Sequence, residues 1–278
     1  MRRSFALLSG FVFVISLFTS ALVAQKAPEQ KVVSGIVSGS VLLKDKSAPD
    51  HKALLTALKS SWKLRTDSIS NFDKTLVFST SFGATVMIAY LDYPAAPDEV
   101  GAASRLSWLW KTAHEETIGH QAQMVISVIG PANRTLELYK IFTQTAAAVL
   151  ETTNSPGVFL QSQYLVLSSG YFIAAARNMV QNQSIPLYCW VYFGRPGEGN
   201  GFTYGMVEFG FPEMEIVQAN QSEGEVHSLL YDAAMSVVKY NTQLEDGQTL
   251  TTEDGASFLV KQGPGTFLEG QKVLRLNY

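Results

Sequence analysis

The chain has 278 residues, of which 46% are hydrophobic and 16% are charged, and its formal net charge is −3. This composition supports a large apolar core and argues against wholesale disorder. A mildly acidic chain without a basic stripe also argues against nucleic acid and anionic lipid surfaces as partners.

The first 24 residues have the order of a bacterial secretory signal peptide. Arg2 and Arg3 precede an uncharged stretch whose centre, residues 11–18, is strongly apolar, and small residues follow up to Ala24. We expect cleavage after Ala21 or Ala24 and export to the periplasm or the medium. The alternative is an uncleaved N-terminal membrane anchor, because about 20 uncharged residues can span a bilayer.

The mature chain is then expected to be soluble. Loss of Arg2 and Arg3 leaves 19 basic residues against 24 acidic ones, a net charge of −5. No later stretch is long and apolar enough for a transmembrane helix, so we expect no membrane span after signal removal. Residues 25–35 are polar and predict a flexible leader, followed by a single α+β domain at 36–278.

Apolar runs and helical periodicity predict the elements of the first half, residues 36–131. In chain order they are a strand, a helix, two strands, a helix and a strand: 37–43, 53–64, 76–82, 84–91, 98–119 and 124–129. This is the βαββαβ order of a ferredoxin-like unit. A long linking helix at 134–152 follows.

The order then recurs in the second half, residues 156–278. Strands are predicted at 158–161, 164–167, 187–193, 202–209, 213–218, 258–261 and 273–276, with helices at 169–180 and 225–240. We therefore expect two ferredoxin-like halves, related by tandem duplication, packed as one compact unit. The strand at 187–193 is apolar on both faces, so other layers are expected to cover both of them.

The most distinctive stretch of the sequence runs from Trp190 to Pro196 and continues at 201–210 and 213–216. It resembles a bacterial family catalogued as domain of unknown function 4261, and further stretches match in the same order over about 36–276. The resemblance implies no activity, ligand or catalytic set, because none is established for the family. Many relatives look cytoplasmic, so the signal peptide is a departure from the family.

Glu213 and Glu215 are the strongest candidates for a catalytic site. Alternate residues of a strand point to one face, so the two carboxylates share a side, and the family pattern has acidic residues at both positions. Two carboxylates in a cleft with shifted pKa values can act as acid and base, with His120 as a third group. The alternative is a polar strand face that alternates with Met214 and Ile216.

Motifs for metals, cofactors and disulfides are missing from the sequence. His114 and His120 are six residues apart, whereas two ligands on one helix face need a spacing of four, so no metal site is expected. We also expect no cofactor. Cys189 is the single cysteine and has no partner for an intramolecular disulfide, so we expect a buried small hydrophobe.

Two functional hypotheses follow. The favoured one is a non-catalytic exported protein of the bacterial cell envelope that binds another protein, with an immunity-like role as one version. Its candidate binding residues are Trp190, Tyr192, Tyr204 and Glu208. The alternative is a hydrolase that uses Glu213, Glu215 and His120. The sequence indicates neither the ligand nor the oligomeric state.

Overall fold

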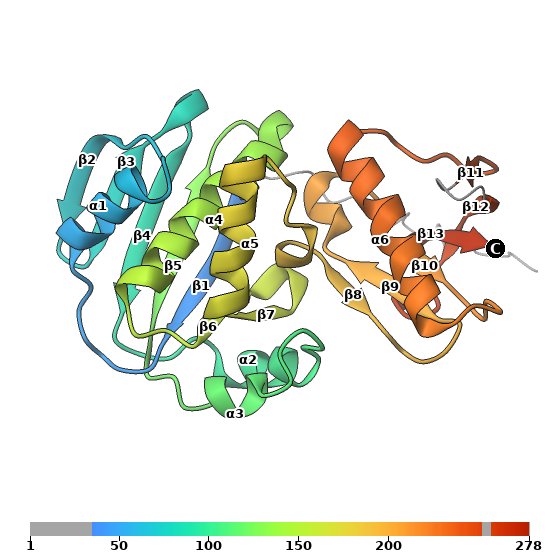
Figure 1. Cartoon of the computed structure of the whole chain (residues 1–278), viewed down its shortest axis with the longest axis horizontal. Helices are drawn as coiled ribbons and strands as arrows, with labels where there is room; N and C mark the ends of the chain where they lie inside the picture. Colours follow the sequence, from blue (N-terminus) through green and yellow to red (C-terminus); the bar gives the residue numbers. More distant parts are fainter. Residues whose placement is uncertain (1–34, 252–256, 278) are drawn as a thin grey trace, which may run out of the picture.

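The computed structural model describes residues 35–251 and 257–277, which form two β-sheets flanked by helices (Figure 1). The first sheet has seven strands in the order β2-β3-β4-β5-β1-β6-β7, and every neighbouring pair is antiparallel. The strands are β1 Ile36–Leu43, β2 Asp67–Phe72, β3 Thr75–Ser79, β4 Thr85–Leu91, β5 Ala122–Ile129, β6 Gly157–Leu160 and β7 Leu165–Ser168. The expected signal peptide, residues 1–24, and most of the expected leader lie outside the described residues.

Three helices cover one face of this sheet: α1 His51–Ser60, α4 Thr135–Thr152 and α5 Ser169–Asn182. α4 contacts β1 and β5 and has α1 and α5 as its helical neighbours. In Figure 1 these helices lie in front of the strands. Alternate side chains of each strand face these helices and form the other side of the core. In β4 they are Val86, Ile88 and Tyr90, which are all buried.

Two shorter helices pack on the opposite face, at the end near β7. They are α2 Pro97–Arg105 and α3 Ala113–Thr117, and both contact β7. A second, smaller apolar cluster forms there: Leu42, Ala95, Val100, Ala103, Trp110, Ala113, Phe159 and Val166. The first sheet is therefore covered by helices along one face and at one end of the other.

The second sheet has the strand order β11-β12-β13-β10-β9-β8. Its strands are β8 Tyr192–Gly194, β9 Gly201–Tyr204, β10 Met214–Ile216, β11 Thr249–Thr251, β12 Ser257–Pro264 and β13 Lys272–Asn277. β10 and β13 are parallel, and the other pairs are antiparallel. Helix α6, Glu223–Tyr240, packs on β8, β9 and β10 through its predicted apolar side.

The α+β class is confirmed, whereas the ferredoxin-like order of the halves is not what the sheets show. In a ferredoxin-like unit, all neighbouring strands are antiparallel and the first strand lies between the third and the fourth, because each helix crosses over between parallel strands that are not adjacent. Here β5 lies between β1 and β4 and pairs antiparallel with both. The two sheets also differ in strand number and order, so nothing in their topology supports a duplication.

The expected boundary between the halves also differs from the structure. β6 and β7, expected to begin the second half, complete the first sheet, because β6 pairs with β1. The helix expected to link the halves, α4, instead packs on the sheet. No helix within 35–251 or 257–277 combines the length and apolarity that crossing a bilayer requires.

Two predicted strands are shorter than expected. In place of a strand over 187–193, residues Leu187–Cys189 form a 3₁₀ helix and only Tyr192–Gly194 is extended. The strand expected over 202–209 ends at Tyr204, because Gly205 has a φ of 122° and Met206–Phe209 forms another 3₁₀ helix. Leu187, Cys189, Trp190 and Phe193 are buried as expected, whereas Tyr188 and Tyr192 are only partly buried.

Gly39 of β1 provides a test of the packing between the first sheet and α4. A β-carbon there would lie 2.7 Å from Phe142 Cζ and 3.1 Å from the Phe159 carbonyl oxygen, so the helix or β6 must shift. We expect Gly39→Ala to lower the free energy of unfolding by about 1–3 kcal/mol, measured by urea denaturation.

Gly170→Ala in the first turn of α5 is the matched control. Nothing lies within 4 Å of the added carbon, so stability should stay constant or rise by about 0.5–1 kcal/mol, as alanine favours helix over glycine. Equal losses in both variants would contradict the close approach of Gly39 to α4.

Candidate functional site

The Glu213 carboxylate is buried immediately before β10 and accepts hydrogen bonds from the preceding turn. Glu213 is 1% exposed. Oε2 accepts from the Thr203 hydroxyl at 2.7 Å, and Oε1 accepts from the backbone N–H of Gly205 at 2.7 Å and of Val207 at 3.4 Å. Both oxygens are thus used to hold the turn between β9 and the following 3₁₀ helix.

The Glu215 carboxylate, in β10, has a similar structural task on another loop. It is fully buried. Oε2 accepts from the N–H of Thr266 at 2.8 Å, and Oε1 accepts from the N–H groups of Phe267 at 2.9 Å and Leu268 at 3.2 Å. The two glutamates therefore stabilise separate loops of the second sheet, and the oxygens of each are occupied by its own loop.

Burial has a measurable electrostatic consequence at Glu213. Loss of water raises the pKa of its carboxyl to about 7, although the hydrogen bonds from Gly205 and Thr203 act in the opposite direction. A carboxyl with this pKa exchanges a proton near neutral pH. The hydrogen-bond partners of this carboxyl are atoms of the turn after β9, so gain or loss of its proton affects the stability of the second sheet.

His120, the third predicted catalytic residue, lies between α3 and β5, in the part of the chain that forms the first sheet. It precedes β5, is 5% exposed, and its Nδ1 lies 2.7 Å from the Thr117 carbonyl oxygen, to which it donates. No hydrogen bond in the described part of the chain joins His120 to Glu213 or Glu215. The structure therefore does not bring the three predicted catalytic residues together as a hydrogen-bonded set.

The four predicted binding residues are divided between the core and the surface. Trp190 is fully buried, and its Nε1 donates to Thr143 Oγ1 at 2.8 Å, so it is a core residue. Tyr192 is partly buried with its hydroxyl 3.4 Å from the Leu106 carbonyl oxygen, and Tyr204 is partly buried beside Tyr164, with ring centroids 6.5 Å apart. Glu208 is partly buried. The burial of Tyr139 raises the pKa of the Tyr139 hydroxyl, and the nearby charge of Glu208 raises it further.

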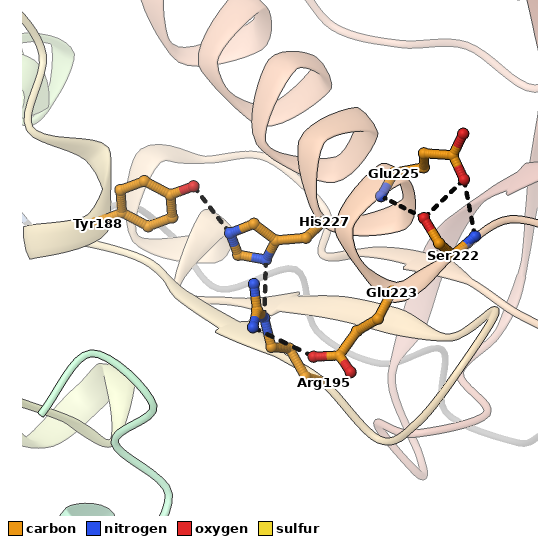
Figure 2. A network of polar contacts seen from close by, with 6 residues as sticks. All are labelled: Tyr188, Arg195, Ser222, Glu223, Glu225 and His227. Carbon is orange, nitrogen blue, oxygen red and sulfur yellow. Dashed lines mark hydrogen bonds and ion pairs between the residues drawn. The ribbon is translucent and has the colours of Figure 1, made fainter. Parts of the chain in front are cut away.

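A different group of side chains meets where the two sheets adjoin, and we call it the junction cluster. Its members are aromatic or charged and come from the turn after α2, the 3₁₀ helix at 187–189, the end of β8 and helix α6: Trp108, Tyr188, Phe193, Arg195, Glu223, His227 and Tyr231. Figure 2 shows Tyr188 and Arg195 directed at the two nitrogens of the His227 ring.

The polar contacts of the junction cluster form a chain centred on His227. The Tyr188 hydroxyl lies 2.8 Å from His227 Nε2, and Arg195 Nε donates to His227 Nδ1 at 3.5 Å. Arg195 Nη1 is 3.2 Å from Glu223 Oε1. An arginine always donates, so Nδ1 must accept and Nε2 carries the proton that is shared with Tyr188.

The aromatic rings hold this chain in place. The Arg195 guanidinium lies 4.3 Å from the centroid of the Trp108 ring, a cation–π contact. Trp108 meets His227 edge-on at 4.8 Å, and Tyr188 stacks on Tyr231 at 4.5 Å. The Arg195 and Glu223 side chains keep 31% and 45% of their surface exposed, so one edge of the cluster is open to solvent.

Electrostatics keep the centre of the cluster neutral at physiological pH. Burial, and then the positive charge of Arg195, lowers the pKa of His227 to about 4. Burial, and then the nearby Tyr231, raises the pKa of Tyr188 to about 12. The remaining charges, on Arg195 and Glu223, oppose each other.

The start of α6 is fixed by a capping box, which positions Glu223 and His227 (Figure 2). Glu225 Oε2 accepts from the Ser222 N–H at 2.9 Å, and Ser222 Oγ accepts from the Glu225 N–H at 3.4 Å. These two bonds satisfy N–H groups that a helix start otherwise leaves without a partner. The cluster is thereby held on a rigid helix end.

Sequence reasoning missed the junction cluster. Trp108 and His227 are far apart in the chain, and His227 occupies an ordinary polar position of an amphipathic helix. The one available signal was the Ser222–Glu225 capping pair, which marks the helix start but not the ring contacts. Within 35–251 and 257–277, no three His, Cys, Asp or Glu side chains are placed to hold a metal ion.

Comparison with known proteins adds a family match to the second sheet. The model of the family described as Domain of unknown function (DUF4261) matches residues 202–277, from β9 to β13. No curated protein and no solved structure matches the chain. The resemblance seen in the sequence is thus confirmed for the C-terminal part, which includes Glu213, Glu215 and His227, and stays a prediction for residues before 202.

The pKa of Glu213 predicts a loss of stability as the pH rises. In the unfolded chain the carboxyl ionises near its usual value of 4.5, whereas in the folded chain it ionises near 7. The folded state therefore binds more protons between these values, and the free energy of unfolding should fall by on the order of 3 kcal/mol from pH 4.5 to above pH 7.

Glu213→Gln should remove this fall, because an amide has no proton to lose and can still accept from Gly205. Urea denaturation of both proteins at several pH values between 4.5 and 8 gives the difference directly. Parallel curves for the wild type and Glu213→Gln would show that Glu213 ionises normally.

The junction cluster predicts an unusually acidic histidine. His227 should remain neutral down to about pH 4, and Arg195→Ala should raise its pKa toward 6.5 because a neighbouring positive charge is lost. Titration of the histidine ring protons by nuclear magnetic resonance measures this, with His227→Gln to assign the signal. A wild-type His227 that titrates near 6.5 would contradict the buried ring.

Proposed function

We propose that this protein is a non-catalytic binding protein of the bacterial cell envelope, which recognises another protein through the junction cluster. The observation that carries the proposal is the partly exposed Arg195 guanidinium lying 4.3 Å from the Trp108 ring beside Tyr188. Tryptophan, tyrosine and arginine are the residues that most often contribute large binding energies at protein interfaces.

The rigidity of the junction cluster supports a binding role. Arg195 is held by Glu223, by His227 and by the Trp108 ring, and the capping box fixes the helix that carries two of these partners. Side chains that are already ordered lose little conformational entropy when a partner binds. The charges of Arg195 and Glu223 favour a partner that presents both a carboxylate and a basic group at this edge.

The bonding of the predicted catalytic residues favours binding over the hydrolase alternative. General acid–base catalysis needs a carboxyl within reach of a substrate. The oxygens of Glu213 and Glu215 instead accept from loop N–H and hydroxyl groups, and His120 donates to the Thr117 carbonyl at the end of α3. A buried carboxylate that satisfies loop N–H groups is a structural acceptor.

The cellular site of the proposal rests on the sequence. Arg2, Arg3 and the apolar stretch that follows them predict a cleaved signal peptide, with a membrane anchor as the alternative. Either form places the folded domain outside the cytoplasm. Neutralisation of a toxin or effector there, an immunity-like role, is one version of the proposed binding function.

The proposal predicts that a partner is lost when the junction cluster is changed. Trp108→Ala and Arg195→Ala should each reduce recovery of the same envelope protein by at least about tenfold, since residues of this kind contribute more than about 1.4 kcal/mol when they are central to an interface. Chemical cross-linking in the encoding cell, followed by quantitative mass spectrometry of the captured proteins, measures the loss.

Tyr93→Ala is the matched control, because Tyr93 is an aromatic residue that is 55% exposed and lies outside the cluster. The control should capture the partner as the wild type does. If every captured protein is recovered equally with all variants, the junction cluster is not the binding site. A turnover that Glu213→Gln and Glu215→Gln abolish, without unfolding the chain, would favour the hydrolase instead.

A further inference from the structure

One face of the first sheet carries a broad surface that the described helices leave uncovered. Side chains alternate along β1, β3, β4 and β5, and those that point away from α1, α4 and α5 are partly or fully exposed, apart from the buried Leu42 and Gln123 at one end. The register places Val77, Met87, Ser127 and Ser38 in one row across the four strands. α2 and α3 cover only the end that contains Leu42 and Phe159.

This surface, which we call the open face, has an unusual composition. Its residues are all small hydroxyl or apolar side chains: Ile36, Ser38, Ser40, Ser70, Phe72, Thr75, Val77, Ser79, Thr85, Met87, Ala89, Leu91, Val125, Ser127 and Ile129. None of them is charged. One charged residue, Asp67, borders the open face at the corner beside Ser79, where it pairs with Arg65.

The second sheet shows what an ordinary solvent-facing strand of this chain looks like. Its exposed and partly exposed positions include Lys261, Lys272 and Arg275. Surfaces of small soluble domains carry about 25–35% charged residues, and the cores of protein interfaces are depleted of them. The open face therefore has the composition of a contact surface, with Ile36, Phe72, Met87 and Ile129 between 38% and 66% exposed.

We propose that a second copy of this chain covers the open face, with the two sheets packed face to face about a two-fold axis. An uncharged face is complementary to itself, because no like charges meet across the axis. Hydroxyl groups both donate and accept, so the rows of serine and threonine can pair with their own copies. Antiparallel sheets commonly pack in this way, at about 10 Å separation.

The size of the open face agrees with a dimer of moderate affinity. Five strands about 4.8 Å apart and about 20 Å long present roughly 500 Å² per copy, or about 1,000 Å² for the pair. This is at the lower bound of specific interfaces, so a dissociation constant on the order of 10 µM is expected. The contact is separate from the junction cluster, and either proposal can fail without the other.

Sedimentation equilibrium of the protein as isolated from the expressing cell tests the dimer. The wild type should change from monomer to dimer between about 1 and 200 µM. Met87 lies in the central row of β4, so Met87→Lys places two positive charges near the axis and should weaken association at least about tenfold. Leu259→Lys is the matched control, because Leu259 is 36% exposed on β12, against 38% for Met87 on β4.

A mixing experiment separates a specific dimer from general aggregation. Met87→Glu should also be monomeric by itself, whereas an equal mixture of Met87→Lys and Met87→Glu should regain the dimer mass. Circular dichroism checks the fold, and Ser127→Glu replaces Met87→Lys if that variant unfolds. A wild type that remains monomeric at about 200 µM, or a dimer that persists in Met87→Lys, overturns the proposal.

Discussion

The whole arrangement depends on the burial of α4 between the first sheet and the loops of the second. Phe142 packs beneath β1, close to Gly39, while on another side Tyr139 stacks on Phe209 at 4.5 Å. Thr143 accepts from the Trp190 indole. Most of the stability of a helix in a folded protein comes from the packing of its apolar face, and α4 is packed on two sides. The same helix therefore packs against both the first sheet and the loops of the second.

Local patterns in the sequence were enough to locate most elements but not their neighbours. The apolar run at Met124–Ile129 predicts a strand, yet nothing in it says that β5 lies between β1 and β4. Pairing of this kind is decided by contacts between distant segments. The strand Asp67–Phe72 was missed because it is a polar edge strand with a register shift, and Leu187–Cys189 shows that an apolar run also suits a buried 3₁₀ helix.

The candidate site was predictable only in part, for a similar reason. Sequence reasoning identified Glu213 and Glu215 as unusual, and both are indeed buried carboxylates. What they do depends on the loops at 203–207 and 266–268, and the second of these lies about fifty residues further along the chain. Residue type therefore indicated where polar groups enter the core, whereas their partners determined that the role is structural. The junction cluster draws on four segments, so no single stretch of sequence could reveal it.

The position of Cys189 has a consequence for life in an oxidising compartment. This lone thiol is fully buried in the 3₁₀ helix before β8, and burial raises its pKa far above the usual range. Disulfide exchange requires an accessible thiolate. Under the export proposed above, one unpaired cysteine would risk mixed disulfides with other proteins, and the fold itself shields the sulfur. The folded protein can therefore keep a reduced cysteine without a partner, and only unfolding would make it reactive.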